Sequence, residues 1–153
     1  MLLIIGIGWG KPVPVDMRNF RNPIRGSALT ALAGPTSNFI TAIILAVPLK
    51  YFGDSMPDSV YSLTMAVFDL SILLGVFNLL PIPPLDGSKV LGLILPERWH
   101  RGYMGYLTQG TMFFVVFLVI DMFLIRKWFG VSVLGMTIGT LYSFVRSVIL
   151  LGT

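Results

Sequence analysis

The sequence contains no cysteine and only one histidine, His100. Without cysteine the chain forms no disulfide and offers no thiolate to a metal ion. A single histidine also excludes an H-E-x-x-H segment, in which two histidines four residues apart share one helix face and bind zinc. The residues present therefore supply no complete zinc site of this kind.

Charged residues are scarce as well. Only 12% of the chain is charged while 55% is hydrophobic, and the mean hydropathy is +0.84. Soluble domains carry roughly 25% charged residues, so this sequence has too few to cover a globule in water and indicates a membrane protein. The 11 Lys and Arg residues form no dense run, so the net charge of +4 does not indicate binding to nucleic acid.

Long apolar stretches take the place of a charged surface. Residues 26–49 and 102–120 carry no charge, and residues 59–85 carry only Asp69. Since a spanning helix needs about 20 mostly apolar residues, we predict an all-α fold, a multi-pass transmembrane helical bundle with three to four spans. It would form a single membrane domain over residues 1–153. The predicted spans are 28–49, 59–80 and 105–125, with 131–151 as a candidate fourth.

The basic residues gather in alternate loops between these stretches. Residues 9–27 and 81–104 hold most of them, whereas residues 50–58 and 126–130 hold few. By the positive-inside rule, the richer loops lie in the cytoplasm. Residues 1–27 are accordingly predicted to be a membrane-associated and cytoplasmic lead-in to the first span.

Residues 78–87, Asn-Leu-Leu-Pro-Ile-Pro-Pro-Leu-Asp-Gly, place a carboxylate at the cytoplasmic end of the second span. Because proline fixes φ and lacks an N–H donor, we predict an extended Pro-rich turn at the membrane interface, whose backbone could pair with a peptide by strand addition. Asn78 could hold a peptide carbonyl, and Gly87 permits a tight backbone conformation. Asp86 is costly near the bilayer unless it is paired or binds a cation. The simpler alternative is that it caps a helix over 88–95.

Two further polar features lie inside the predicted spans. Residues 33–38, Ala-Gly-Pro-Thr-Ser-Asn, carry small and polar side chains into the first span. Such residues allow close packing of a neighbouring helix, or they form a wall beside an active site. Asp69 in the second span is either a packing contact with a neighbouring helix or a partner of Asn38 or of a substrate backbone.

The segment Asn78-x-x-Pro81-x-Pro83-x-Leu85-Asp86-Gly87 resembles in full the second signature of the site-2 protease family of intramembrane zinc metalloproteases. Gly34-Pro35-x-x-Asn38 resembles the glycine-proline-asparagine motif on the preceding core helix of that family. Residues 9–16, Trp-Gly-Lys-Pro-Val-Pro-Val-Asp, and residues 20–26 resemble the lead-in of small bacterial members that have no PDZ domain. The resemblance extends over nearly the whole chain.

This resemblance implies a zinc-dependent endopeptidase that cleaves membrane-spanning protein segments in the bacterial cell membrane, with Asp86 toward the cytoplasmic face. In the family, one zinc ion is bound by the two histidines of H-E-x-x-H and the aspartate of Leu-Asp-Gly, and the glutamate is the general base. The expected partners are a transmembrane or membrane-proximal protein substrate and membrane lipid. The implied roles are metal ligand for Asp86, substrate binding for Asn78, Pro81, Pro83 and Asn38, and a structural part near the site for Gly34, Pro35 and Gly87.

The chain departs from the family in lacking H-E-x-x-H, so none of its residues is predicted to be catalytic. Both histidine ligands and the general base are expected upstream. His100 is assigned to a polar loop over 96–104; the alternative is that Glu97 and His100 form an improvised site beside Asp86. One explanation of the gap is a start assigned at an internal Met, which makes this chain an N-terminally truncated form, the C-terminal part of a peptidase core, and inactive alone. The other is a non-catalytic pseudoprotease or scaffold that binds transmembrane segments.

Overall fold

The computed structural model describes residues 20–150, apart from the side chain of Glu97. These residues form helices joined by turns, with no strand among them, which confirms the predicted all-α fold. Most of the predicted lead-in, residues 1–19, lies outside the described residues. The helical elements are α2 (Pro23–Phe52), η2 (Gly53–Ser55), α3 (Asp58–Leu79), α4 (Asp86–Ile94), η3 (Glu97–Trp99), α5 (His100–Ile120), η4 (Asp121–Ile125), α6 (Arg126–Phe129) and α7 (Val133–Ile149).

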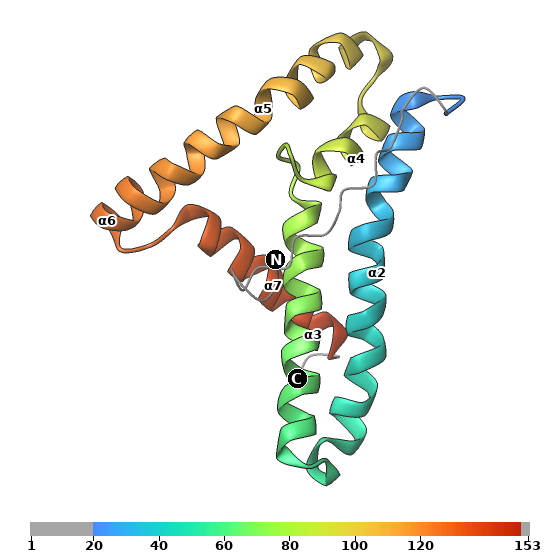
Figure 1. Cartoon of the computed structure of the whole chain (residues 1–153), viewed down its shortest axis with the longest axis vertical. Coiled ribbons are helices and arrows are strands. Elements are labelled where there is room, and N and C mark those ends of the chain that lie inside the picture. Colours follow the sequence, from blue (N-terminus) through green and yellow to red (C-terminus); the bar gives the residue numbers. More distant parts are fainter. Residues whose placement is uncertain (1–19, 151–153) are drawn as a thin grey trace, which may run out of the picture.

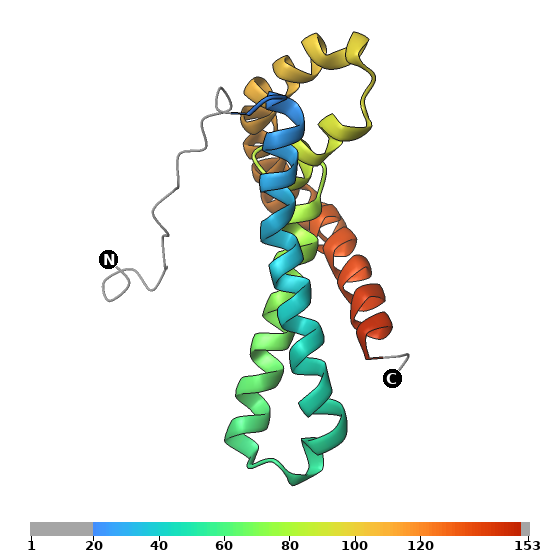
Figure 2. The same cartoon turned by 90° about the vertical axis from the view of Figure 1, so that its right-hand side faces the viewer.

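Helices α2 and α3 stand side by side as an antiparallel hairpin (Figures 1 and 2). Small side chains let them approach closely. Ala42 and Ala46 of α2 belong to one buried cluster with Phe68 and Ile72 of α3. At Gly75 of α3 an added Cβ would lie 2.8 Å from the ring of Phe39 on α2, so a larger residue there would displace this ring. The hairpin is the rigid frame from which the Pro-rich turn projects.

The start of α2 follows from its local sequence. The side chain of Asn22 caps the helix by accepting a hydrogen bond from the backbone N–H of Arg25 at 3.1 Å. Pro23 occupies the first helical position, where its missing N–H costs nothing. The helix therefore begins five residues before the predicted span and continues past Pro35 and Pro48 without ending.

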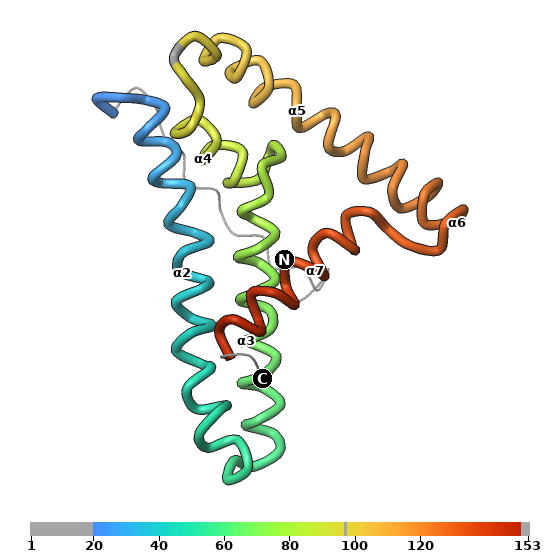
Figure 3. The backbone as a smooth tube through the Cα atoms, turned by 180° about the vertical axis from the view of Figure 1, so that it is seen from behind, coloured from blue at the N-terminus to red at the C-terminus, as the bar shows by residue number. Residues whose placement is uncertain are grey.

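Helix α5 leaves the hairpin at a wide angle (Figures 1 and 3). It begins at His100, so the prediction of a polar loop over 96–104 is wrong for its last five residues. The α-helical hydrogen bonding of α5 changes to a π-helical turn at Asp121–Ile125, and the helix continues to Phe129. Among the described residues, three helical segments, 23–55, 58–79 and 100–129, are long and apolar enough to cross a membrane, which confirms a multi-pass architecture.

Helix α7 turns back from α6 and crosses α3 (Figure 1). Gly130 makes the turn possible because its φ of 74° lies in the left-handed region that favours glycine. The carboxylate of Asp121, 1% exposed, then holds the start of α7. It accepts hydrogen bonds from the Ser132 hydroxyl, from the N–H of Val133 at 2.7 Å and from the N–H of Leu134 at 3.3 Å.

Asp69 holds the middle of α7 against α3. Its Oδ1 accepts a hydrogen bond from the Tyr142 hydroxyl at 2.7 Å and lies 3.4 Å from Nε of Arg146. Of the two interpretations of Asp69, packing against a neighbouring helix is thus confirmed. Asn38 is not among the hydrogen-bond partners of Asp69 that the described residues provide.

Candidate metal centre

The Pro-rich segment between α3 and α4 is a compact turn. The N–H of Leu80 bonds to the carbonyl of Phe77, that of Ile82 to Leu80 at 2.8 Å, and that of Leu85 to Ile82 at 2.9 Å. The other residues between Leu80 and Leu85 are prolines, which have no N–H. Every N–H group in this stretch is therefore bonded locally. The backbone is extended at Leu85, but the expectation of amides free to pair with a peptide strand is wrong, and only carbonyl groups remain to receive one.

Helix α5 supports this turn from one side. At Gly110 an added Cβ would lie 2.7 Å from Cγ of Pro83, so the helix and the proline ring are in close contact. The Tyr106 hydroxyl donates a hydrogen bond to the carbonyl of Pro81. Pro83 is fully buried, whereas Pro81 is exposed. Sequence reasoning did not identify the two contacts of α5, since they join residues more than twenty positions apart without any motif between them.

Asp86 is the first residue of α4 and does not cap it. The cap position is Leu85, which makes no side-chain capping bond, and the hydroxyl of Ser88 donates to the Leu85 carbonyl instead. The Asp86 side chain is 33% exposed, and its Oδ1 accepts a hydrogen bond from Nζ of Lys89 at 3.1 Å. The capping alternative is therefore wrong. Lys89 was missed as a partner, although a cation three residues after a carboxylate in a helix is a recognisable signal.

The motif on α2 lies against this carboxylate. A Cβ added to Gly34 would be 3.5 Å from Oδ2 of Asp86, an ordinary contact distance. Pro35 is fully buried beside it, and Asn38 and Asn78 are half-buried. The structure thus brings the glycine-proline segment of α2 to the start of α4. Among the hydrogen bonds of the described residues, none involves either asparagine amide.

Gly87 is required by packing rather than by its backbone angles. A Cβ at this position would lie 2.5 Å from the carbonyl oxygen of Leu80 and closer still to that of Leu79. Any larger residue would collide with backbone atoms, which cannot rotate away. Gly87 therefore lets α4 begin directly under the end of α3, and this position fixes where the Asp86 carboxylate points.

The donor set of this region does not fit a zinc ion by itself. Zinc in proteins takes four ligands, of which a catalytic site draws three from side chains. No group of three His, Asp or Glu side chains comes together within residues 20–150. His100 starts α5 with its Nε2 3.2 Å from the carbonyl oxygen of Leu95. The alternative site with Glu97 lies outside the described side chains.

Comparison with known proteins identifies relatives of one kind. Residues 49–120 match the sequence profile of peptidase family M50. The chain is 35% identical to "Putative zinc metalloprotease YwhC" of Bacillus subtilis, over 78% of this chain and 57% of that protein. It is 33% identical to "Zinc metalloprotease MJ0392" of Methanocaldococcus jannaschii, over 54% of this chain and 23% of that protein.

A third relative, "Putative zinc metalloprotease Rip2" of Mycolicibacterium smegmatis, is 30% identical over 69% of this chain and 40% of its own length. The chain thus spans little more than half the length of the Bacillus protein and less of the others. No solved structure matches it significantly. The matched range of the profile contains the Pro-rich turn and Asp86, whereas Gly34 and Asn38 precede it.

Proposed function

Because this chain belongs to peptidase family M50, the site-2 protease family, we propose that it is part of an intramembrane zinc endopeptidase in which Asp86 is one metal ligand. The observation that carries the proposal is the position of Asp86. Its carboxylate stands one-third exposed at the start of α4, with Oδ2 against Gly34 of α2. The names of the relatives, all zinc metalloproteases, support the same chemistry.

The remaining ligands would come from outside the 153 residues. Two histidines and a general-base glutamate are needed, and the single histidine of this chain is bonded to a carbonyl at the start of α5. The coverage of 57% of the Bacillus relative leaves a large part of that protein without a counterpart here. In this proposal the chain supplies one carboxylate ligand of the zinc site and is inactive alone.

The substrate would be a membrane-spanning or membrane-proximal protein segment. Pro81 is exposed, and Asn78 and Asn38 are half-buried with side-chain amides that make no described hydrogen bond. Such amides can hold a peptide carbonyl or N–H. Because the turn has no free N–H, Asn78 and Asn38 would supply the donors that the backbone lacks, while exposed carbonyls of the turn accept from the peptide.

The Asp86 end would lie on the cytoplasmic side of a bacterial cell membrane. The loops on that side of the three apolar helices are the basic ones, as the positive-inside rule requires. Cleavage would then occur near the cytoplasmic end of a substrate helix.

A second candidate function is a non-catalytic protein that binds transmembrane segments. The ion pair between Asp86 and Lys89 favours it, because it compensates the carboxylate without any metal. The two functions differ in whether the natural protein retains zinc.

The deciding experiment uses the protein expressed from its gene with the native upstream DNA. Intact mass would establish the length of the product, and elemental analysis its zinc content. We expect about one zinc per chain, lost in Asp86→Ala and retained in the matched variant Asp58→Ala, whose carboxylate lies at the far end of α3. A product of confirmed mass that holds no zinc and cleaves no membrane-anchored substrate would overturn the peptidase proposal.

A further inference from the structure

Three helices meet at the end of the molecule that carries Asp86. At Gly92 of α4, an added Cβ would lie 2.7 Å from Cγ2 of Ile24 on α2 and 2.9 Å from the hydroxyl of Tyr103 on α5. The same hydroxyl lies 3.0 Å from the carbonyl oxygens of both Ser88 and Lys89. The first turns of α2 and α5 therefore both pack against α4, at the upper end of the view in Figure 1.

Four exposed arginines surround this junction. Arg21 and Arg25 flank the start of α2, and Arg98 and Arg101 flank the start of α5. We call them the junction arginines. Within the described residues, the ion pairs are Asp86–Lys89 and Asp69–Arg146, so no carboxylate there neutralises any of the four.

Stability of the helices does not explain these cations. The start of a helix carries a partial positive charge, which acidic side chains stabilise and basic ones oppose. The first turns of α2 and α5 contain no acidic residue and contain Arg25 and Arg101 instead. The four like charges at this junction are therefore available to an anionic partner from outside the described residues.

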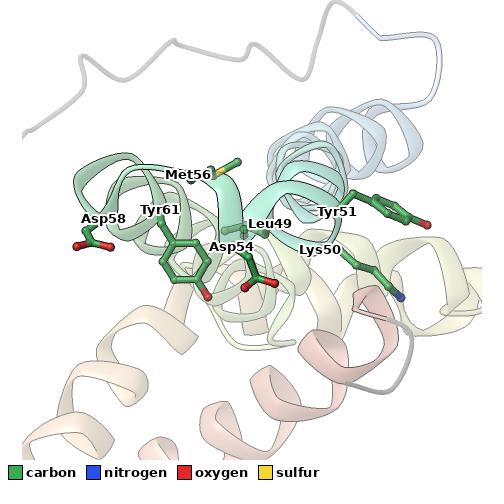
Figure 4. A pocket seen from close by; sticks show the side chains of 8 residues that line it. Leu49, Lys50, Tyr51, Asp54, Met56, Asp58 and Tyr61 are labelled. Atoms are coloured by element: carbon green, nitrogen blue, oxygen red, sulfur yellow. The ribbon is translucent and has the colours of Figure 1, made fainter.

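The opposite end of the hairpin has a different character. A hollow of about 340 Å³ lies where α2 turns into α3 (Figure 4). Two carboxylates, Asp54 and Asp58, line it together with Lys50, whose Nζ lies 3.4 Å from the carbonyl of Leu150. Of the two ends of the hairpin, the Asp86 end is thus the one with an excess of positive charge among the described residues.

Aromatic side chains at the junction indicate its depth in the membrane. Trp99, between two of the arginines, is 60% exposed, and Tyr106 one turn beyond Tyr103 is 38% exposed. Tryptophan and tyrosine concentrate at the level of the lipid headgroups. Arginine side chains near helix ends extend into the same layer, with their stems on apolar surface and their guanidinium groups at the phosphates.

We propose that the junction arginines form a contact surface for the headgroups of anionic phospholipids. The chemistry matches in three respects: the sign of the charge, the depth, and the lack of an ion-pair partner for the four arginines among the described side chains, which do not include that of Glu97. Juxtamembrane cations attract anionic headgroups within about a Debye length of the membrane surface. The contact goes beyond peptidase function and does not depend on a metal, a substrate or the missing histidines.

The test uses Trp99 as a local reporter. The chain has three tryptophans, so Trp9→Phe with Trp128→Phe leaves Trp99 alone. The protein is reconstituted in mixtures of phosphatidylcholine and phosphatidylglycerol in which one or the other is brominated, and quenching gives the relative occupancy next to Trp99. We expect phosphatidylglycerol to be enriched there. Arg98→Gln with Arg101→Gln should reduce this preference about fivefold for each cation removed.

The controls separate charge from structure. Arg98→Lys with Arg101→Lys keeps the charge and should keep most of the preference, and added salt should weaken it in the parent protein. Arg126→Gln with Lys127→Gln removes two exposed cations from the other end of the same helical segment and should leave Trp99 quenching unchanged. Equal quenching by the two lipids in the parent, or an undiminished preference in the Gln variant with native helix content, would overturn the proposal. So would a surface that binds an acidic peptide while showing no lipid preference.

Discussion

The carboxylate of Asp86 lies against the backbone of Gly34, so close that a Cβ on Gly34 would be 3.5 Å from Oδ2. Its other oxygen, Oδ1, is held by Lys89 within α4 at 3.1 Å. Oδ1 of Asp86 is thus bonded within α4, whereas Oδ2 faces α2. This spacing leaves room for a methyl group on Gly34, a position that is otherwise exposed.

The effect of a substitution of Gly34 on the stability of the protein should therefore depend on the size of the new side chain. Gly34→Ala makes ordinary contact with Asp86 and should leave the melting temperature unchanged or slightly raised, because alanine is favoured over glycine in helices by about 0.5–1 kcal/mol. Gly34→Leu brings a longer apolar side chain next to the Asp86 carboxylate and should be less stable than Gly34→Ala. Thermal unfolding in detergent measures both. Equal stability of the two variants would show that α2 and α4 are not in this close contact.

Gly87→Ala should be strongly destabilising. The new Cβ would lie 2.5 Å from the carbonyl oxygen of Leu80, and backbone atoms cannot move aside without displacing α4 from the end of α3. We expect a loss of about 1–3 kcal/mol, together with increased proteolysis of the turn. Gly105→Ala is the control, because an added Cβ there meets nothing within 4 Å and should raise stability slightly.

The bond between Asp69 and Tyr142 should show coupling in a double-mutant cycle. Asp69→Ala and Tyr142→Phe each remove a hydrogen bond of 2.7 Å between α3 and α7. Because polar contacts between membrane helices are worth about 0.6 kcal/mol on average, the double variant should be less destabilised than the two single variants added together, by roughly that amount. Strict additivity would mean that the bond contributes nothing to docking of α7.

Asp121→Ala should loosen the start of α7 while leaving the α2–α3 hairpin intact. The N–H groups of Val133 and Leu134 would lose their acceptor, at a cost of about 0.5–1.5 kcal/mol for each of these part-buried bonds. Hydrogen exchange at these two amides reports the change directly. Asp58→Ala, an exposed carboxylate in the first turn of α3, should change exchange at the same amides by no measurable amount.

The sequence predicts the helices well because charge-free runs of spanning length have few other solutions in a membrane. It also predicts that residues 33–38 and Asp86 belong to one site, although only through resemblance to a family. The contacts between the Pro-rich turn and α5 could not be predicted in this way. They join Gly110 to Pro83 and Tyr106 to Pro81, which lie more than twenty positions apart in the sequence.

Asp121 shows a different limit of sequence reasoning. It directly follows the charge-free run 102–120, and the pattern of apolar runs by itself assigns it no partner. Its partners follow shortly after in Ser132–Leu134, where a serine before an apolar helix is a capping signal. The serine and the aspartate taken together predict the contact.

The start of α5 at His100 was not predicted, because the polar composition of its first turn is also typical of a loop.

The partners of Asp69 have a consequence for how the protein is made. They lie 73 and 77 residues later in the chain, so α3 must enter the bilayer during synthesis with its carboxylate still unpaired. An aspartate at the centre of an inserted helix costs about 2.5–3.5 kcal/mol, which the apolar residues around it must outweigh until α7 emerges. The partners of Asp121 follow 11 to 13 residues after it and arrive almost at once. Asp69 of α3 thus gains its partners only when α7 has been synthesised. A ribosome stalled before residue 142 would leave the α2–α3 hairpin inserted in the membrane with Asp69 unpaired, as a target for quality control.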